Sequence, residues 1–542
     1  MRRALAAIVA FLAVVTSAAT PEAEPGVFES SVAPAPQGRI DKLVLARLSA
    51  LGIQPALCSD AVFVRRVYLD VIGKLPTAKE AREFIQDPNA KNKRRLLVDR
   101  LLERDEFAEY WAMKWGDILR IKAEFPVNLW PNAAQAYHRW VRASLAQNKP
   151  YDKFVREMLT SSGSNFRVGP VNFYRAIQDR TPEGIATTVA LTFMGTRAES
   201  WPKDQLTGMA AFFSQIGYKP TREWKEEVVF WDPLRTSAQD SNSVSSVSGS
   251  QPTNTAPRTT IFPDGKLVKL PSDRDPREVF ANWLITSRNP WFTRNIANRV
   301  WSWLLGRGII HEPDDIRPEN PPSNPALLTF LEKELVGSRY DLKHLYRLIL
   351  NSRTYQFSSV PRAEVAQAEA NFGSYTLRRL EAEVLIDAIN QVTGSSDLYT
   401  SAIPEPFTYI PVDQPAVALV DGSITSPFLA LFGRSARATG MENERANKVL
   451  PAQWLHLLNS SHIQRKLEQG PRLKAIFDSG RKPPEIVEEL YLTILSRFPT
   501  PDEVKLAEDY GKSGKSRAVK RREDWVDITW ALINSTEFLY RH

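Results

Sequence analysis

Acidic side chains gather most densely between His311 and Asn320, where four carboxylates and one imidazole fall within ten positions. Carboxyl groups held this close together can act on a substrate as a general acid and a general base. The candidates for that chemistry are three of these carboxylates: Asp314, Asp315 and Glu319. The sequence thus offers one segment in which an enzyme could keep its proton donor and acceptor.

The same segment offers ligands for a divalent cation, because hard cations prefer carboxylate oxygens and the local prolines would hold the loop extended. The candidate ligands are His311, Glu312 and Asp314. The alternative is structural, with Asp315 and Arg317 forming an ion pair that fixes a loop between two helices. The sequence favours this structural interpretation, so we predict no resident cofactor, although a divalent cation stays open.

Alternating charges mark a second segment, 433–448. Guanidinium groups match the planar or tetrahedral geometry of carboxylate and sulfate, so this segment could bind an anionic polysaccharide. The candidate ligand-binding residues, with one from the first segment, are Arg317, Arg434, Arg437, Glu442 and Arg445. The alternative, which is favoured, is an internal network of ion pairs between the last helices.

Among the 14 tryptophans, Trp130 precedes Pro131 in an irregular stretch and is the candidate for stacking on a sugar ring. Burial in the core is the favoured alternative for this side chain. His456 and His462 are six positions apart and do not share a helix face as an i, i+4 pair would. We expect both histidines to pack between helices rather than bind a ligand.

The composition excludes several classes of site. A single cysteine, Cys58, rules out a disulfide framework, a four-thiolate zinc site and an iron–sulfur cluster. We expect that thiol to be buried and inert. The motifs of serine hydrolases, zinc proteases, nucleotide-binding loops and dinucleotide folds are all absent from the sequence.

The first residues predict export. Arg2 and Arg3 precede an apolar stretch, Ala4–Val15, and the small residues Ser17–Ala19, so residues 1–19 resemble a signal peptide. Cleavage would lower the formal net charge from +8 to about +6. No later segment reaches the roughly 20 apolar residues of a membrane helix. We therefore predict a periplasmic or extracellular protein, with no transmembrane segment after cleavage and no nucleic-acid partner.

Composition and periodicity then divide the chain. Residues 20–38 predict a tether, residues 39–235 a helical domain, residues 236–258 a Ser/Thr/Pro linker, and residues 259–542 a second helical domain. Strand patterns are scarce, and the turn at Pro263–Gly265 predicts one short hairpin. The expected fold is mainly α, with two multi-helical halves, a flexible linker and at most a short β-hairpin.

The two halves share an order of landmarks. Phe107, Trp115 and Tyr151 of the first half correspond in sequence and approximate spacing to a second set of three residues: Phe292, Trp301 and Tyr340. A distant duplication would explain the match. Chance similarity between amphipathic helices is the alternative, and the sequence leaves the choice open.

Longer stretches resemble a known pair of domains. Phe63–Thr77 and Tyr110–Asp117 resemble domain of unknown function 1549, the planctomycete cytochrome-associated type. Stretches after the linker resemble its usual companion, domain of unknown function 1553: Pro276–Val279, Asn298–Trp301, Leu305–Gly308, Asp315–Pro318, Pro321–Pro325, Tyr340–Lys343, Ser352–Tyr355, Arg378–Leu380 and Leu457–Ser460. The resemblance covers nearly all of residues 40–540 and implies no settled activity.

One departure from that family bears on function. Many relatives carry a Cys-x-x-Cys-His segment just before a helix resembling Leu206–Phe213, and are often fused to c-type cytochromes. Here Phe193–Pro202 leads into that helix without cysteine or histidine. Covalent haem attachment needs both thiols and an axial imidazole, so this chain has no haem site there.

These observations favour an exported binding or assembly protein of the envelope or periplasm that engages a polysaccharide or a protein partner. The resemblance implies an exported sulfatase-like protein as one such partner, because relatives are often encoded beside one. The alternative is a glycan-active enzyme that uses the loop carboxylates. Electron transfer through c-type haem is disfavoured by the missing thiols.

Overall fold

The computed structural model describes residues 27–89, 91–235, 258–446, 448–510 and 521–542. The predicted signal peptide at 1–19, part of the predicted tether and nearly all of the predicted linker lie outside these residues. Within the described ranges helices dominate and strands are short, so the chain is mainly α-helical as predicted.

The helices before residue 236 are α2 (Arg39–Ala50), α3 (Asp60–Ile72), α4 (Ala78–Gln86), α5 (Lys93–Leu102), α6 (Asp105–Ile118), α7 (Pro131–Ala146), α8 (Tyr151–Thr160), α9 (Asn172–Arg175), α10 (Pro182–Val189) and α11 (Lys203–Ala210). Those after residue 258 are α12 (Pro276–Leu284), α13 (Phe292–Leu305), α14 (Pro325–Gly337), α15 (Leu342–Leu350), α16 (Val365–Ala370), α17 (Ala382–Thr393), α18 (Pro427–Leu431), α19 (Pro451–Asn459), α20 (Ser461–Gln469), α21 (Pro471–Phe477), α22 (Pro483–Ile494), α23 (Pro501–Asp509), α24 (Arg522–Ile533) and α25 (Thr536–Leu539). The strands are β1 (Gly163–Ser164), β2 (Ile216–Pro220), β3 (Glu227–Trp231), β4 (Arg258–Ile261), β5 (Leu267–Leu270), β6 (Arg378–Arg379) and β7 (Tyr540–Arg541).

Besides the helices, the described residues form small antiparallel sheets. The predicted hairpin is present as β4–β5, with Gly265 at φ 83° in the turn, a backbone region that glycine adopts without strain. The strand order β1–β3–β2 forms a second sheet, and β6 pairs with β7 next to the C-terminus. The β content therefore exceeds the single hairpin expected from sequence, although every sheet stays small.

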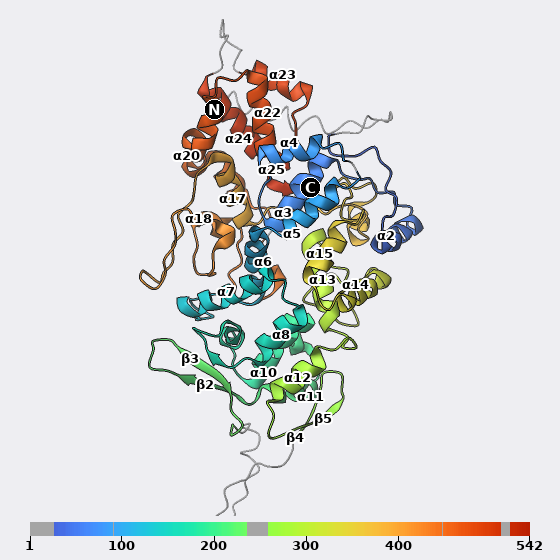
Figure 1. The fold of residues 1–542 in the computed structure, drawn as a ribbon, viewed down its shortest axis with the longest axis vertical. Helices are drawn as coiled ribbons and strands as arrows, with labels where there is room; N and C mark the ends of the chain where they lie inside the picture. The colour runs from blue at the N-terminus through green and yellow to red at the C-terminus, as the bar shows by residue number, and fades with distance from the viewer. Residues whose placement is uncertain (1–26, 90, 236–257, 447, 511–520) are drawn as a thin grey trace, which may run out of the picture.

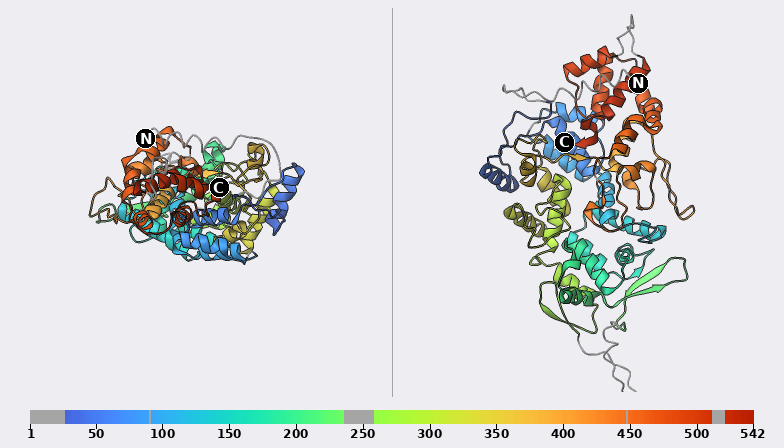
Figure 2. Two further views of the ribbon diagram at one scale, coloured as in Figure 1. Left: turned by 90° about the horizontal axis from the view of Figure 1, so that it is seen from above. Right: turned by 180° about the vertical axis from the view of Figure 1, so that it is seen from behind.

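The two halves pack against each other along the length of an elongated molecule. Near the top of Figure 1 α22 lies on α4, in the middle α15 contacts α5, and at the lower end α8 contacts α12. Figure 2 shows the same three levels from behind. A single hydrophobic core runs through all levels, from Ile40 to Leu539. Any functional site between the halves is therefore held on a rigid body.

The structure also bears on the suspected duplication. Helices α5–α8 and α12–α15 follow each other in the same order, and α6 and α13 have equal length, with 14 residues each. The first helix of each set contacts the last helix of the other set. At their meeting point the Tyr151 N–H donates to the Tyr340 carbonyl at 3.0 Å. This reciprocal packing favours duplication, and we call residues 93–160 the first repeat and 276–350 the second repeat.

Candidate functional site: a buried charge network

The loop between α13 and α14 carries the first predicted cluster, and Asp314 points inward from it. Its carboxylate is 3 % exposed. One oxygen accepts from the Arg299 guanidinium at 2.7 Å and the other from the Glu442 backbone N–H at 2.7 Å. Both oxygens are thus engaged, and Asp314 fixes the loop to α13 and to the segment around residue 442.

Asp315 lies at the surface and forms the ion pair expected from sequence, 3.1 Å from the Arg317 guanidinium. The Asn320 side-chain amide closes the loop by donating to the backbone carbonyls of His311 and Asp315, at 2.7 and 2.9 Å. The structural interpretation of this segment therefore accounts for its contacts.

Three further members of this segment are exposed side chains: His311, Glu312 and Glu319. Burial of the ring and the nearby Arg307 lower the pKa of His311. Among the residues that the structure describes, no three His, Cys, Asp or Glu side chains are arranged to hold a metal ion. The predicted ligand set of His311, Glu312 and Asp314 is thus not brought together, because Asp314 turns away from solvent.

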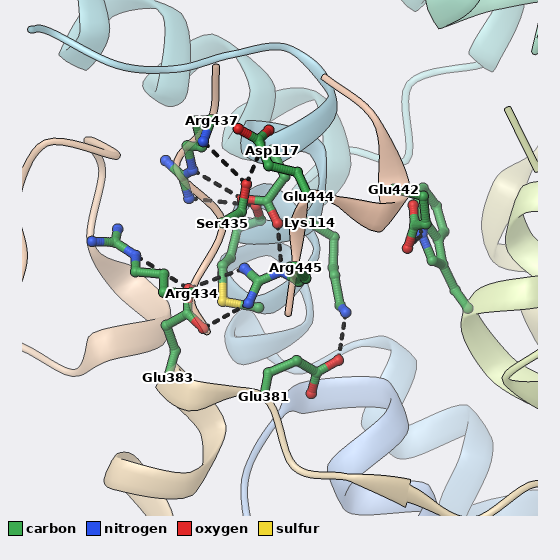
Figure 3. Close-up of polar contacts among 12 residues, drawn as sticks. Lys114, Asp117, Glu381, Glu383, Arg434, Ser435, Arg437, Glu442, Glu444 and Arg445 are labelled. Atoms are coloured by element: carbon green, nitrogen blue, oxygen red, sulfur yellow. Dashed lines mark hydrogen bonds and ion pairs between the residues drawn. The ribbon is translucent and has the colours of Figure 1, made fainter. Parts of the chain in front are cut away.

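In the second predicted cluster, in contrast, the side chains of Arg434, Arg437 and Arg445 are buried. Figure 3 shows its arginines converging on α6 and on the start of α17. The Arg437 guanidinium is fully buried and donates to Asp117 at 3.0 Å, while Arg445 donates to the other oxygen of Asp117 at 2.6 Å. Arg437 also donates to the carbonyls of Ile121 and Val420, so its guanidinium group is engaged by acceptors of the protein.

Glu383 is the second anchor of this cluster. Its carboxylate is fully buried and accepts from Arg445 at 2.7 and 3.0 Å and from Arg434 at 3.2 Å. Although burial opposes ionisation, these two cations hold the pKa of Glu383 at about 2. Burial lowers the pKa of Arg434 to about 10. Residues Asp117, Glu383, Arg434, Arg437 and Arg445 are called the buried charge network below.

Glu442 joins the two predicted clusters. Its carboxylate lies 3.5 Å from Arg299 and accepts from the Trp303 indole N–H at 3.0 Å. Burial raises the pKa of Glu442 despite the attraction of Arg299. Two segments more than a hundred residues apart, each singled out from sequence, therefore meet at one place.

Sequence reasoning missed a second group of charges beside this network. Lys114 donates to Glu381 at 2.5 Å, and Glu381 also pairs with Arg541 near the C-terminus. Arg541 contacts Asp70 at 3.2 Å, and Asp70 accepts from the Tyr355 hydroxyl at 2.8 Å. The available signal was an acidic residue inside an apolar helical run, as Asp70 is, because such a residue needs a buried partner.

Trp130 is not fully buried in the core, which was the favoured alternative for it. It precedes α7 with φ 71°, is half-buried, and its ring centroid lies 5.3 Å from that of Phe407. The same two loops carry Phe125 and Tyr409, which are 79 % and 71 % exposed. We call Phe125, Trp130, Phe407 and Tyr409 the aromatic surface.

His456 and His462 do not share a helix face, as expected from their spacing, but they do meet. Ser460 ends α19 and caps α20, so the two rings belong to different helices and come within 3.4 Å. The other nitrogen of His462 lies 2.7 Å from Asp397. A break in the helix between the histidines is what the six-residue argument did not include.

Comparisons with known families agree with the resemblance seen in the sequence. Residues 39–216 match the family model described as protein of unknown function (DUF1549), and residues 276–510 match the model described as protein of unknown function (DUF1553). No curated protein and no solved structure matches the chain. Of the helices in the described ranges, none combines the length and apolar character needed to cross a membrane.

Proposed function

We propose that this chain, which combines the two domains of unknown function, is an exported binding protein of the envelope or periplasm that holds a polysaccharide on its aromatic surface. The observation that carries the proposal is the exposure of several aromatic rings on two loops that are themselves fixed. Exposed aromatic clusters of this kind are uncommon on soluble proteins unless they bind something. The apolar faces of sugar rings suit aromatic side chains, which offer a large contact area at low entropic cost.

The loop before α7 is tied by polar contacts to the segment around Asp421 and to the loop that carries Phe407. The Ala123 N–H donates to Asp421 at 2.8 Å and the Glu124 N–H to the Ser423 hydroxyl at 2.9 Å. The Glu124 carboxylate in turn accepts from the Ala402 N–H at 3.1 Å. Because these contacts hold the rings in place before a ligand arrives, little ordering entropy would be lost on binding.

The charged groups favour binding over catalysis. An enzyme acting on glycans needs a carboxylate that can reach a substrate, whereas Asp314 is buried and Asp315 is paired with Arg317. The guanidinium groups of Arg434 and Arg437 face carboxylates of the protein, not solvent. The proposal therefore rests on the aromatic rings, and it does not require an anionic polymer.

Affinity electrophoresis of the mature chain tests the proposal in gels containing laminarin, xylan, dextran or κ-carrageenan. At least one of these polymers should retard the wild type. Trp130→Ala and Phe407→Ala should each weaken that retardation by about tenfold or more, the usual cost of truncating a central aromatic contact.

Trp224→Ala is the matched control, because Trp224 is 69 % exposed in the turn between β2 and β3, away from the aromatic surface. Its retardation should equal that of the wild type. Absence of retardation by all four polymers would overturn the proposal. Equal losses in the Trp130 and Trp224 variants would do the same. An exported sulfatase-like protein is the alternative occupant of the aromatic surface, and direct titration with such a protein distinguishes it.

A further inference from the structure

An open cleft of about 640 Å³ lies at the lower end of the molecule, away from the buried charge network. It is bounded by the end of α8, the last residue of β3 and the segment that leads into α12. Its volume falls in the range of about 300–1,000 Å³ that is usual for small-ligand sites. Neither the predicted clusters nor the aromatic surface contributes to it.

Arg277 connects two of the residues that line the cleft, Asp275 and Ser162. Arg277 is 1 % exposed, and its guanidinium donates to Oδ2 of Asp275 at 2.7 Å and to Oδ1 at 3.1 Å. It also donates at 3.1 Å to the Ser161 carbonyl and to the Ser162 hydroxyl, at the end of α8. The face of the Tyr174 ring lies 5.6 Å below it. A bidentate arginine of this kind fixes the positions of the groups around it.

Trp231 forms one wall of the cleft. Its indole N–H donates to the Gln215 side chain at 3.0 Å, which fixes the orientation of the ring, and the residue is only half-buried. Hydroxyl groups of Thr160 and Ser162 lie on the adjoining side. An oriented aromatic face beside hydroxyl and carboxylate groups is suited to a ring that is apolar on its faces and polar at its edge.

The charges around the cleft nearly cancel. Asp275 is neutralised by Arg277, and Arg274 lies 3.4 Å from Glu278. Asp273, an exposed residue that lines the cleft, adds one negative charge to this balance. A polyanion would therefore gain little here, whereas a neutral polyol can donate its hydroxyl protons to these carboxylates.

We propose that this cleft is a second saccharide subsite, which takes one or two neutral sugar units with a ring face against Trp231 and hydroxyls toward Asp273 and Glu278. The proposal rests on the proposed function for its class of ligand, a polysaccharide. It adds a site at the opposite side of the first repeat from the buried charge network, and a preference for neutral over sulfated sugars.

Isothermal titration of the mature chain with neutral hexasaccharides of cellulose, xylan and laminarin tests this site, because such short chains can occupy the cleft alone. Trp231→Ala should weaken binding of the preferred hexasaccharide by at least tenfold. Glu278→Gln, at an exposed position, should weaken it by about threefold without disturbing the clamp around Arg277. Trp224→Ala, in the turn of the same β2–β3 hairpin as Trp231 but not among the residues that line the cleft, should leave the affinity unchanged.

The ratio of affinities for a neutral and a sulfated hexasaccharide gives an independent test of the cleft. Asp273→Asn should narrow the ratio of affinities between the neutral hexasaccharide and a sulfated κ-carrageenan hexasaccharide, since it removes the exposed negative charge. Wild-type affinity in Trp231→Ala, or an equal loss in Trp224→Ala, would overturn the subsite. So would a wild type that binds none of the hexasaccharides.

The two proposals fail separately. If the polysaccharide gels respond to Trp130→Ala but hexasaccharide binding ignores Trp231→Ala, the cleft proposal is overturned and the proposed function stands. If hexasaccharides bind at the cleft while Trp130→Ala leaves polymer retardation unchanged, the aromatic surface is overturned as the polymer-binding face.

Discussion

The two helical repeats use the same loop position in opposite ways. In the first repeat the loop between α6 and α7 carries Phe125, which is exposed, and Trp130, which is half-buried. In the second repeat the loop between α13 and α14 carries His311–Asn320 and turns Asp314 inward onto Arg299. In both repeats the helix after the loop begins with proline, so the loop ends in the same manner.

One segment contacts both repeats and explains the difference. Arg437 and Arg445 reach Asp117 near the end of α6, while Glu442 reaches Arg299 on α13. The charged side chains of the second loop are needed to fasten this segment. The first loop follows a helix that supplies its own carboxylate, Asp117, and the Phe125 ring of this loop faces solvent. The same architecture thus gives one loop that fastens a distant segment and one loop that leaves the Phe125 ring exposed.

Removing the carboxylate of the first repeat should have the largest effect. Asp117→Asn leaves Arg437 and Arg445 buried without their shared counter-charge. Breaking a buried pair in this way costs about 3–5 kcal/mol. Urea denaturation followed by circular dichroism measures the loss, and a loss below about 1 kcal/mol would contradict the assigned role.

Two glutamates, Glu383 in the buried charge network and Glu442 outside it, should affect stability in opposite directions as the pH changes. The pKa of Glu383 falls to about 2 in the folded protein, so its ionisation stabilises the fold above the unfolded pKa near 4.5. This contribution, about 3 kcal/mol, is lost as the pH falls from about 5 toward 2. Glu383→Gln should therefore be less stable than the wild type at pH 7, and the gap should close on acidification.

Glu442 has a raised pKa in the folded protein, so folding disfavours its ionised form. Its contribution is present below its unfolded pKa and is lost as the pH rises through the folded value. Glu442→Gln should gain stability relative to the wild type as the pH rises from 4 to 8. Urea midpoints across this range test both glutamates, and parallel curves for the two variants would contradict the contrast.

Periodicity sufficed to predict that the chain is mainly helical, because the causes of helix formation are local. Reciprocal Thr–Glu contacts, for example, cap α4 at Thr77 and α23 at Thr500. The hairpin at Pro263–Gly265 was equally local, since its turn residues dictate the backbone. Long-range contacts were different: whether Asp314 faces solvent depends on Arg299 and on Glu442, a residue more than a hundred positions away.

In the candidate site, too, local features could be predicted from the sequence and long-range contacts could not. Residue types identified the arginines near 437 as partners of carboxylates, and the favoured interpretation was an internal network. Their true partners, Asp117 and Glu383, sit inside predicted helices and gave no local pattern of their own. Trp130 was selected for its irregular setting, but its neighbour Phe407 comes from a loop almost 280 residues later. Topology, not residue type, determines such pairs.

Substitution of the two adjacent aspartates of the second loop compares a buried ion pair with one at the surface. We expect a moderate effect on stability. Asp314→Asn should destabilise the fold by about 2 kcal/mol, because Arg299 keeps only Glu442 as a nearby counter-charge. Asp315→Asn should cost less than about 1 kcal/mol, since its pair with Arg317 is exposed to solvent. Thermal and urea unfolding of the two variants give a direct ratio. Equal losses would show that the loop is not fastened through Asp314.

The smallest effect on stability belongs to the outward loop of the first repeat. Phe125→Ala should change the free energy of unfolding by less than about 0.5 kcal/mol, because the ring is 79 % exposed. Leu129→Ala, in the same loop but fully buried, should cost about 2–5 kcal/mol and serves as the control. If Phe125→Ala also weakens polysaccharide retardation, its side chain acts in binding and not in folding. A large loss of stability in Phe125→Ala would instead place this loop in the same structural class as its counterpart between α13 and α14.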